Sequence, residues 1–185
     1  MAFHQTIGLA VAECMPYLQG RQDLSVLEFG NQRFKLTPQT LATVTAKTGK
    51  NFTFPQEAQA YADSTYSYFE QLGFSRYLAI DLNTKMRAVV MDLNKDCRKE
   101  YDFTDQFDLV TNNGTGEHVF DQRMVFENMH NMTKVGGIML NVMPMIPWLN
   151  HGFYNFHPVL FRDLAYANDY KWCFLWVGTN LGRYK

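Results

Sequence analysis

Two histidines occupy positions from which a side chain could act on a bound molecule. His118 follows a polar turn at residues 112–116, and His151 lies in an aromatic loop after the next apolar segment. A neutral imidazole has a pKa near neutrality, so it can accept a proton from an oxygen or nitrogen atom. We therefore predict that His118 and His151 are catalytic bases. The competing interpretations are a hydrogen bond at a helix start for His118 and ring stacking in the loop for His151.

An acidic residue also stands near the end of an apolar segment at residues 25–29. This residue is Glu28, and a buried carboxylate costs several kcal/mol unless a partner compensates its charge. The partner is either a ligand hydroxyl or amine, or a basic side chain such as Arg33 or Lys35. Gly30 follows at a point where the backbone must turn tightly or approach a ligand closely.

A second acid, Asp81, ends the apolar segment 77–80. An acid at this place in a nucleotide-binding α/β sheet commonly accepts hydrogen bonds from both hydroxyls of a ribose. Only a short link precedes the apolar segment 88–91, which ends at Asp92. Parallel connections normally take a dozen or more residues, so the two segments form either a parallel pair with an extended link or an antiparallel pair. We favour the parallel pair, which places Asp92 near Asp81.

The middle of the chain shows the pattern of a strand, a turn, a helix and a second strand. Residues 107–111 are apolar and β-branched, and apolar residues then recur at helical spacing as far as Lys134 and Gly136, which indicate a helix end. Glu117 is interpreted as a favourable charge at the start of this helix. A strand at 138–142 completes a unit that predicts a parallel sheet, in which ligands bind beyond the carboxyl ends of the strands.

Further elements are predicted on both sides of this unit. Alternating strands and helices make the expected fold an α/β, Rossmann-like three-layer sandwich with a mostly parallel sheet, formed by residues 1–185 as a single domain. The other predicted segments are a helix at 4–20, an insertion or lid at 31–55, a helix at 57–72, a loop at 143–158, a helix at 158–168 and a final strand at 170–177.

Composition limits the kinds of partner. With 46% hydrophobic residues and a formal net charge of −1, the chain favours a folded core and no broad binding to nucleic acid or to an anionic membrane. Cys14, Cys97 and Cys173 are widely spaced, and no segment has the length of a membrane span, so we expect a cytoplasmic protein with reduced thiols. The histidines lack a recognised zinc spacing, and we expect no metal site.

Five short motifs follow one another along most of the chain. They are Val-Leu-Glu-Phe-Gly at 26–30, Ala-Ile-Asp at 79–81, Met-Asp-Leu-Asn at 91–94, Phe-Asp-Leu-Val at 107–110 and Lys-Val-Gly-Gly at 134–137. In this order and spacing they resemble the class I S-adenosylmethionine-dependent methyltransferases, which implies S-adenosylmethionine as the cofactor. The implied cofactor-binding residues are Glu28 and Gly30 beside the methionine part, Asp81 at the ribose, Asp92 and Leu93 at the adenine, Asn112 near the sulfonium and the substrate, and Asn31, Gln32, Leu82 and Gly114 as further contacts.

The chain departs from this family pattern in three places. Asn31, Gln32 and Arg33 replace further glycines of the first loop, a helix is missing between the second and third strands, and the last strand of the family sheet is not expected. A noncatalytic binding or scaffold protein with the same sheet is therefore an alternative. A nicotinamide-dependent oxidoreductase is another, because Asp81 would serve either ribose, although no Gly-x-Gly-x-x-Gly turn follows the first strand.

Aromatic side chains gather in the loop that contains His151. Trp148, Phe153 and Tyr154 are predicted to bind the substrate, because aromatic rings form an apolar wall or stack on a flat ring. Packing within the loop is the competing interpretation. A substrate wall at a strand end favours a small molecule, such as a sugar or an aromatic metabolite, over a protein or a nucleic acid.

Overall fold

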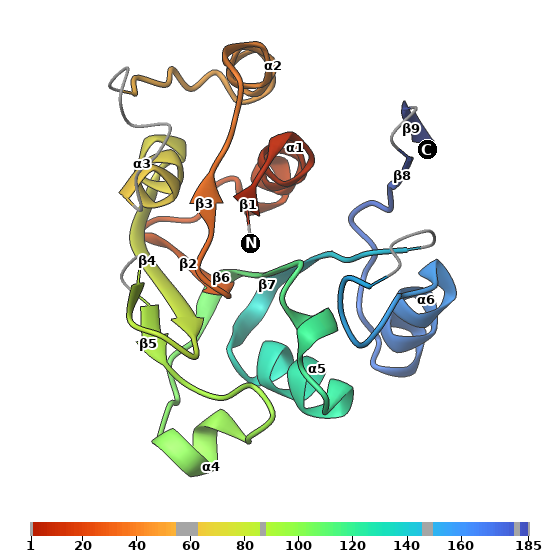
Figure 1. Ribbon diagram of the computed structural model, residues 1–185. Helices are drawn as coiled ribbons and strands as arrows, with labels where there is room; N and C mark the ends of the chain where they lie inside the picture. The colour runs from red at the N-terminus through yellow and green to blue at the C-terminus, as the bar shows by residue number, and fades with distance from the viewer. Residues whose placement is uncertain (1, 55–62, 86–87, 146–149, 180–181, 185) are drawn as a thin grey trace.

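A sheet of five parallel strands forms the centre of the protein (Figure 1). The computed structural model describes residues 2–54, 63–85, 88–145, 150–179 and 182–184. The sheet has the order β5-β4-β2-β6-β7, and neighbouring strands all run in the same direction. The strands are β2 (Leu24–Phe29), β4 (Phe74–Asp81), β5 (Ala88–Val90), β6 (Phe107–Asn113) and β7 (Thr133–Val142).

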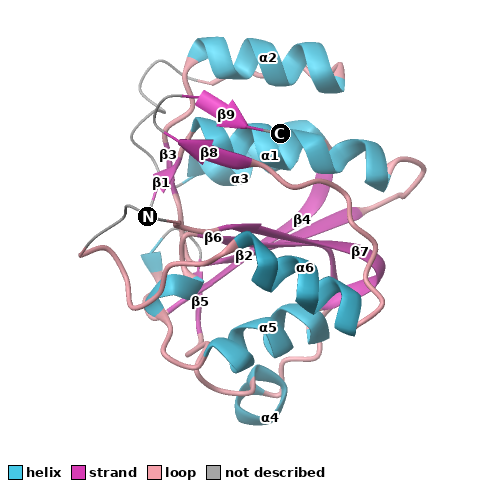
Figure 2. Ribbon diagram, turned by 90° about the vertical axis from the view of Figure 1, so that its right-hand side faces the viewer, coloured by secondary structure: helices cyan, strands magenta, loops and turns pink. Residues whose placement is uncertain are grey.

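Helices cover both faces of the sheet and produce three layers (Figures 1 and 2). The predicted Rossmann-like sandwich is therefore confirmed. On one side lie α1 (Gln5–Cys14), α2 (Pro38–Thr48) and α3 (Asp63–Leu72); on the other lie α4 (Cys97–Tyr101), α5 (Gln122–Asn131) and α6 (Pro158–Ala167). The short elements are β1 (Ala2–Phe3) paired with β3 (Arg33–Phe34), β8 (Val177–Thr179) paired with β9 (Gly182–Tyr184), and the 3-10 turns η1 (Met15–Leu18) and η4 (Gly116–His118).

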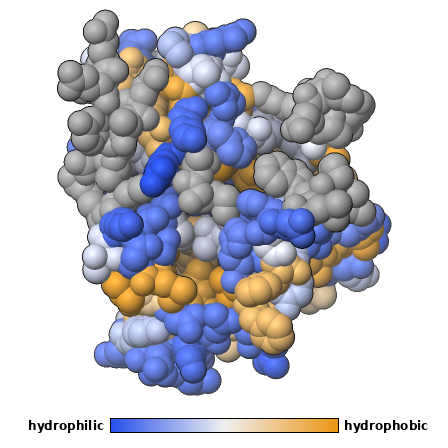
Figure 3. All heavy atoms as spheres, in the orientation of Figure 1, coloured by the Kyte–Doolittle hydropathy of each residue, from blue (hydrophilic) through white to orange (hydrophobic). Residues whose placement is uncertain are grey.

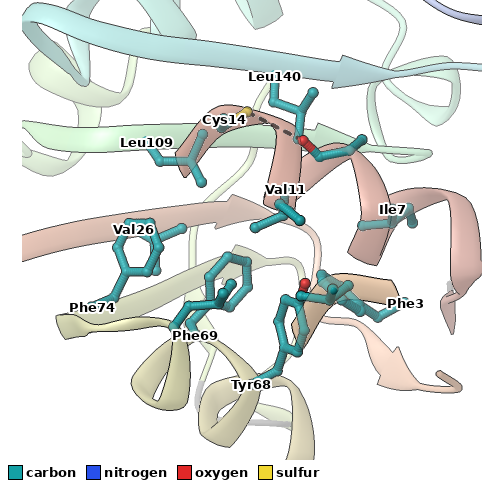
Figure 4. Packing of buried hydrophobic residues seen from close by; sticks show 14 of the residues in the cluster. Phe3, Ile7, Val11, Cys14, Val26, Tyr68, Phe69, Phe74, Leu109 and Leu140 are labelled. Carbon is teal, nitrogen blue, oxygen red and sulfur yellow. Dashed lines mark hydrogen bonds between the residues drawn. The ribbon is translucent and has the colours of Figure 1, made fainter. Parts of the chain in front are cut away.

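Both faces of the central strand β2 are buried, as expected where helices cover each side of a parallel sheet. Val26 faces the α1 and α3 side, where the rings of Phe3, Tyr68 and Phe69 pack with centroids 5.2–5.7 Å apart (Figure 4). The hydroxyl of Tyr68 donates a hydrogen bond of 2.7 Å to the carbonyl of Gly8 in α1, so this buried polar group is satisfied.

The opposite face of the sheet packs against α4 and α5. Leu27 of β2 and Val110 of β6 lie in a second buried cluster with Val125 and Met129 of α5. Because adjacent residues of a strand point to opposite faces, the apolar run in β2 supplies both clusters. This double burial fixes the register of β2 between β4 and β6.

The connection between β4 and β5 resolves the choice between parallel and antiparallel pairing. Ala79, Ile80 and Asp81 pair in parallel with Ala88, Val89 and Val90. The favoured parallel arrangement is confirmed, and residues 82–85 of the link contain no α-helix. The helix that the family pattern has between these two strands is therefore missing from the described part of the connection.

The predicted end of the central helix at Gly136 is wrong. The helix α5 ends at Asn131, and β7 already begins at Thr133. Lys134 does not stabilise a helix end, because its ammonium group lies 2.8 Å from the carboxylate of Asp108 at the start of β6. Gly136, with φ +71°, interrupts the strand where its pairing register with β6 shifts, so the glycine forms an irregularity in β7.

Two other predicted segments also differ from the structure. Residues 31–55 include the ordered helix α2, which begins at Pro38 because proline suits the first turn and the Thr37 side chain caps it. A strand at 170–177 is wrong, since residues 170–176 form no strand and β8 starts only at Val177. The predicted helix at 57–72 is confirmed within the described residues as α3.

The longest described helix, α2, has 11 residues. None of the helices within the described residues combines the length and the apolar character that crossing a membrane requires.

The amino ends of the strands are held by an ion cluster around Asp108. Its carboxylate lies 2.8 Å from both Arg21 and Lys134 and accepts hydrogen bonds from the backbone and hydroxyl of Ser25. Burial alone would raise the pKa of Asp108, but these donors outweigh it and lower the pKa to about 2. The cluster therefore stabilises the fold above the unfolded pKa and is lost as the pH falls toward 2.

We expect Asp108→Asn to reduce the free energy of unfolding by about 2 kcal/mol at pH 7, the value of a shift of roughly this size. Urea unfolding monitored by circular dichroism would measure the loss, and the difference from the unmodified chain should shrink between pH 4 and pH 2. Asp105→Asn is the control, because Asp105 pairs with Arg76 in a half-exposed ion pair. Equal losses for the two variants would contradict the stabilising role of Asp108.

Candidate functional site

The carboxyl ends of β2, β4 and β6 meet at one edge of the sheet. The backbone N–H of Gly30 donates to the carbonyl of Ile80 at 2.7 Å, and the backbone N–H of Asn31 donates to Asp81 Oδ2 at 2.9 Å. Phe29 is paired in register with Asn112 of β6. The structure therefore brings together the glycine, the acid and the asparagine that the sequence places at three separate strand ends.

Glu28 is fully buried on the α3 side of this edge. Its Oε2 atom accepts a hydrogen bond of 2.6 Å from the hydroxyl of Tyr77, and among the described residues no lysine or arginine pairs with it. Burial raises the pKa of Glu28 to about 8, while Tyr77 and Asn113 act in the opposite direction. Asn113 lowers the pKa of Glu28 by its proximity, because its Nδ2 atom forms no hydrogen bond of normal geometry. The alternative partner considered for Glu28, an ion pair with Arg33 or Lys35, is therefore absent from the described residues.

Several buried oxygen atoms beside Glu28 lack a hydrogen-bond donor. They are Glu28 Oε1, Gln32 Oε1, Thr111 Oγ1 and Asn113 Oδ1. Thr111 is the register partner of Glu28, and Gln32 Nε2 donates to the carbonyl of Asn113 at 3.1 Å, so the four residues adjoin one another. Buried acceptors without donors are rare in folded proteins. A ligand that carries an ammonium group or several hydroxyls would satisfy them.

Asp81 is positioned by side chains and backbone of the neighbouring loops. Asn83 Nδ2 donates to Asp81 Oδ1 at 2.7 Å, and the amide of Asn31 in turn donates to Asn83 Oδ1 at 2.8 Å. Each carboxylate oxygen keeps acceptor capacity beyond these single bonds. Leu82 projects beside the acid with 72% of its surface exposed.

Two other predicted contacts lie after β5. Asp92 Oδ1 accepts hydrogen bonds from the backbone and side chain of Asn94, and Leu93 is buried in the cluster with α5. The edge strand β5 exposes Val89 and Val90, and the face drawn in Figure 3 shows apolar surface gathered in the lower half of the view. Apolar surface therefore adjoins this end of the site.

Gly30 is covered by a side chain from the loop after β6. Its φ of +83° favours glycine, and a Cβ atom built on it would lie 2.1 Å from Thr115 Oγ1. The hydroxyl of Thr115 donates a hydrogen bond of 2.7 Å to the carbonyl of Phe29. Gly30, which was expected to approach a ligand closely, is therefore in contact with Thr115. Nothing in the sequence indicated a role for Thr115.

Asn112 shapes the turn that follows β6. Its Oδ1 accepts a 2.8 Å hydrogen bond from the backbone of Gly116, and its Nδ2 donates to Asn141 of β7 at 3.2 Å. Gly114, at φ +66°, donates its backbone N–H to the carbonyl of Val142 at 2.9 Å. These bonds attach the turn to two adjacent strands and place η4 at the edge of the sheet.

The histidines predicted as bases lie together, with Glu117 between them. Glu117 Oε1 is 3.2 Å from His151 Nε2 and 3.8 Å from His118 Nε2, and the imidazole centroids are 5.1 Å apart. Glu117 is not a charge at the start of the central helix, because α5 begins at Gln122 with Asp121 as its cap. Its side chain is instead only 1% exposed. The sequence missed this role, since nothing in the spacing distinguishes a buried glutamate from a solvated one.

The aromatic loop after β7 docks on the turn η4. The backbone N–H groups of Phe153 and Tyr154 donate to the carbonyl of Glu117 at 2.7 and 3.3 Å, and the hydroxyl of Tyr154 donates to the carbonyl of Phe120 at 2.8 Å. The rings of Phe153 and Phe120 are largely exposed and meet edge to face with centroids 6.4 Å apart. Tyr154 is therefore partly structural, while the Phe153 ring, in the same loop as His151, remains 68% exposed. Trp148 lies outside the described residues.

The open parallel sheet, with a glycine turn and an acid at neighbouring strand ends, places the protein in the class of Rossmann-like folds. Residues 62–141 match the family model described as a methyltransferase domain. The match covers less than half of the chain, and it confirms the predicted resemblance to the class I S-adenosylmethionine-dependent methyltransferases. No curated protein and no solved structure matches the chain significantly.

Proposed function

We propose that the protein transfers a methyl group from S-adenosylmethionine to an oxygen or nitrogen atom of a small molecule. The observation that carries this proposal is the meeting of Glu28, Gly30 and Asp81 at one edge of the sheet, whose strands β4, β5 and β6 lie in the stretch that matches the family model. The same edge also carries two histidines and an exposed aromatic ring on its β6 and β7 side. Cofactor residues and acceptor residues therefore adjoin each other.

The residues at the edge fit the cofactor chemically. Glu28 and Gln32 supply acceptors without donors, which suit the ammonium group of the methionine part. Asp81 faces the ribose side with unused acceptor capacity, and Leu82 with the apolar surface near β5 suits the flat adenine ring. When bound, the cofactor supplies an electrophilic methyl group on a sulfonium.

The remaining residues would prepare the acceptor. Methyl transfer is an in-line displacement, so positioning and removal of the acceptor's proton are the main tasks of the protein. His151 is oriented by Glu117 and can accept that proton, with His118 beside it. The exposed ring of Phe153 forms an apolar wall for the substrate.

A noncatalytic cofactor-binding protein is the second candidate. It is favoured by the contact of Thr115 with Gly30 and by the hydrogen bonds that Asn31 and Asn83 already make to Asp81. These contacts must adjust for a ligand to approach the glycine. Hydride transfer with a nicotinamide is disfavoured, because the first turn lacks the three glycines that cradle a pyrophosphate.

Calorimetric titration with S-adenosylmethionine, S-adenosylhomocysteine and NAD tests this proposal. We expect the first two ligands to bind and NAD not to bind. Asp81→Ala should weaken binding of S-adenosylhomocysteine by at least about 10-fold, because a charge-assisted hydrogen bond to the ribose is lost. Asp105→Ala, at the opposite end of the strands, should leave the affinity unchanged. Binding of NAD alone, or no binding of the adenosyl ligands, would contradict the proposal.

A further inference from the structure

Glu117, His118 and His151 together offer the donor set of a metal centre. Each residue has one ligand atom in the cluster, and these atoms all lie within 4.8 Å of one another. Two imidazole nitrogens and one carboxylate oxygen are the donors found in many zinc and non-haem iron sites. The spacing of the three residues in the sequence gave no indication of this, since His151 comes from a different loop.

The separations within the cluster are close to those that a metal ion requires. Ligands at about 2.0–2.1 Å from a tetrahedral zinc ion lie roughly 3.3 Å from each other. Glu117 Oε1 is 3.2 Å from His151 Nε2 and 3.8 Å from His118 Nε2. All three ligand atoms lie within 4.8 Å of one another, so the imidazoles would have to move closer together when a tetrahedral ion binds.

An unsatisfied atom of Glu117 points independently to a cation. Glu117 Oε2 is buried and has no hydrogen-bond partner, although the side chain is only 1% exposed. A carboxylate in such surroundings costs several kcal/mol unless a positive charge compensates it. A metal ion bound to the cluster would supply that charge.

The backbone around Glu117 is also fixed in place before any ion binds. Gly152 packs so closely that a Cβ atom would lie 2.7 Å from Glu117 Cγ, and Phe153 donates its N–H to the Glu117 carbonyl. Asn112 holds the other side of the turn through Gly116. Rigid support of this kind favours metal binding, because little ordering remains to be done when the ion enters.

We propose that Glu117, His118 and His151 bind one divalent transition-metal ion. Three protein ligands leave a fourth position open, and His118 is the most exposed of the three, so that position would be accessible beside the ring of Phe153. Metal binding at this site is a property separate from methyl transfer, and it does not require the cofactor. An acceptor hydroxyl coordinated at the open position would lose its proton to solvent more readily, and the imidazoles would then act as ligands instead of bases.

Titration of the chelator-stripped protein with zinc chloride tests the site, and cobalt chloride reports coordination through its visible absorption. We expect one ion per chain with micromolar or tighter affinity. Glu117→Gln and His151→Gln should each weaken zinc binding by about 100-fold. The matched control is His130→Gln, because His130 is an exposed imidazole on α5 that contacts Tyr170. The zinc affinity of this variant should equal that of the unmodified chain.

Thermal unfolding provides a second measurement if a variant is destabilised. Zinc should raise the unfolding temperature of the unmodified chain and of His130→Gln, but not that of Glu117→Gln. Zinc affinity weaker than millimolar, or affinity unaffected by Glu117→Gln and His151→Gln, would overturn the metal site. Titration of the metal-free protein with S-adenosylhomocysteine separates the two proposals. If the protein binds S-adenosylhomocysteine but not zinc, only the metal site is refuted. If it binds zinc but not S-adenosylhomocysteine, only the proposed methyl transfer is refuted.

Discussion

Glu28→Gln is expected to make the protein more stable at pH 8 and above while weakening its affinity for the adenosyl cofactor. Glu28 has a pKa of about 8 in the folded chain against an ordinary value of 4.5. Below the lower value the residue is protonated in both states. Between the two values the unfolded chain ionises and the folded chain does not, so the stability falls as the pH rises.

The size of this effect follows from the pKa difference. At about 1.4 kcal/mol for each pKa unit, the penalty above pH 8 has an upper bound of roughly 5 kcal/mol. Glutamine keeps the hydrogen bond from Tyr77 and removes the ionisation, so we expect a gain of about 3 kcal/mol at pH 8.5 and little change at pH 4. Urea unfolding across this pH range measures both values.

The control for this variant is Glu100→Gln, because Glu100 is exposed in α4 and its substitution should leave the pH profile unchanged. Calorimetry with S-adenosylhomocysteine should show weaker binding to Glu28→Gln, since the amide cannot pair with an ammonium ion as a carboxylate does. Parallel stability profiles for the unmodified chain and Glu28→Gln would show that the carboxyl does not titrate in this way.

Gly30→Ala is expected to destabilise the protein by about 4 kcal/mol. Two costs add at this position: the left-handed backbone, worth about 1–2 kcal/mol for alanine, and the collision of the new methyl group with Thr115, which resembles severe overpacking. Gly20→Ala separates the two costs. Gly20 has nearly the same φ of +82°, but no atom lies within 4 Å of its Cβ position, so only about 1–2 kcal/mol should be lost there.

A double-mutant cycle with Thr115→Ala tests the collision directly. Removal of Thr115 Oγ1 and Cγ2 leaves the Thr115 Cβ atom at 3.1 Å from the new methyl group, a tight contact that a shift of a few tenths of an ångström would relieve. Gly30→Ala should therefore cost about 2 kcal/mol less in the Thr115→Ala background than in the unmodified chain. Additive losses would mean that Thr115 does not occupy the space above Gly30.

Much of the architecture could be predicted from the sequence, because local patterns determined it. The apolar runs ending in Glu28, Asp81 and Asn112 mark buried parallel strands, and the edge where they meet follows from strand direction alone. The parallel pairing of β5 was also predictable, although the short link made it a choice between two arrangements.

The errors arose where contacts distant in sequence outweighed local pattern. Lys134 and Gly136 are residue types typical of a helix end. Lys134 lies instead in β7, where it forms an ion pair with Asp108. Glu117 has the composition of an exposed residue at a helix start, but the loop that carries His151 covers it. Thr115 and Tyr77 became visible only when neighbouring strands were assembled.

The position of β2 in the middle of the sheet has a consequence for synthesis of the chain. Ser25 forms hydrogen bonds with Asp108, 83 residues later. The first strand of the central sheet to leave the ribosome therefore lacks its second neighbour until most of the polypeptide has emerged. Sheets whose strands pair over such long sequence distances fold slowly, and their folding intermediates expose apolar surface and are prone to aggregate. The nascent protein should therefore depend on chaperones more than a helical bundle of equal length.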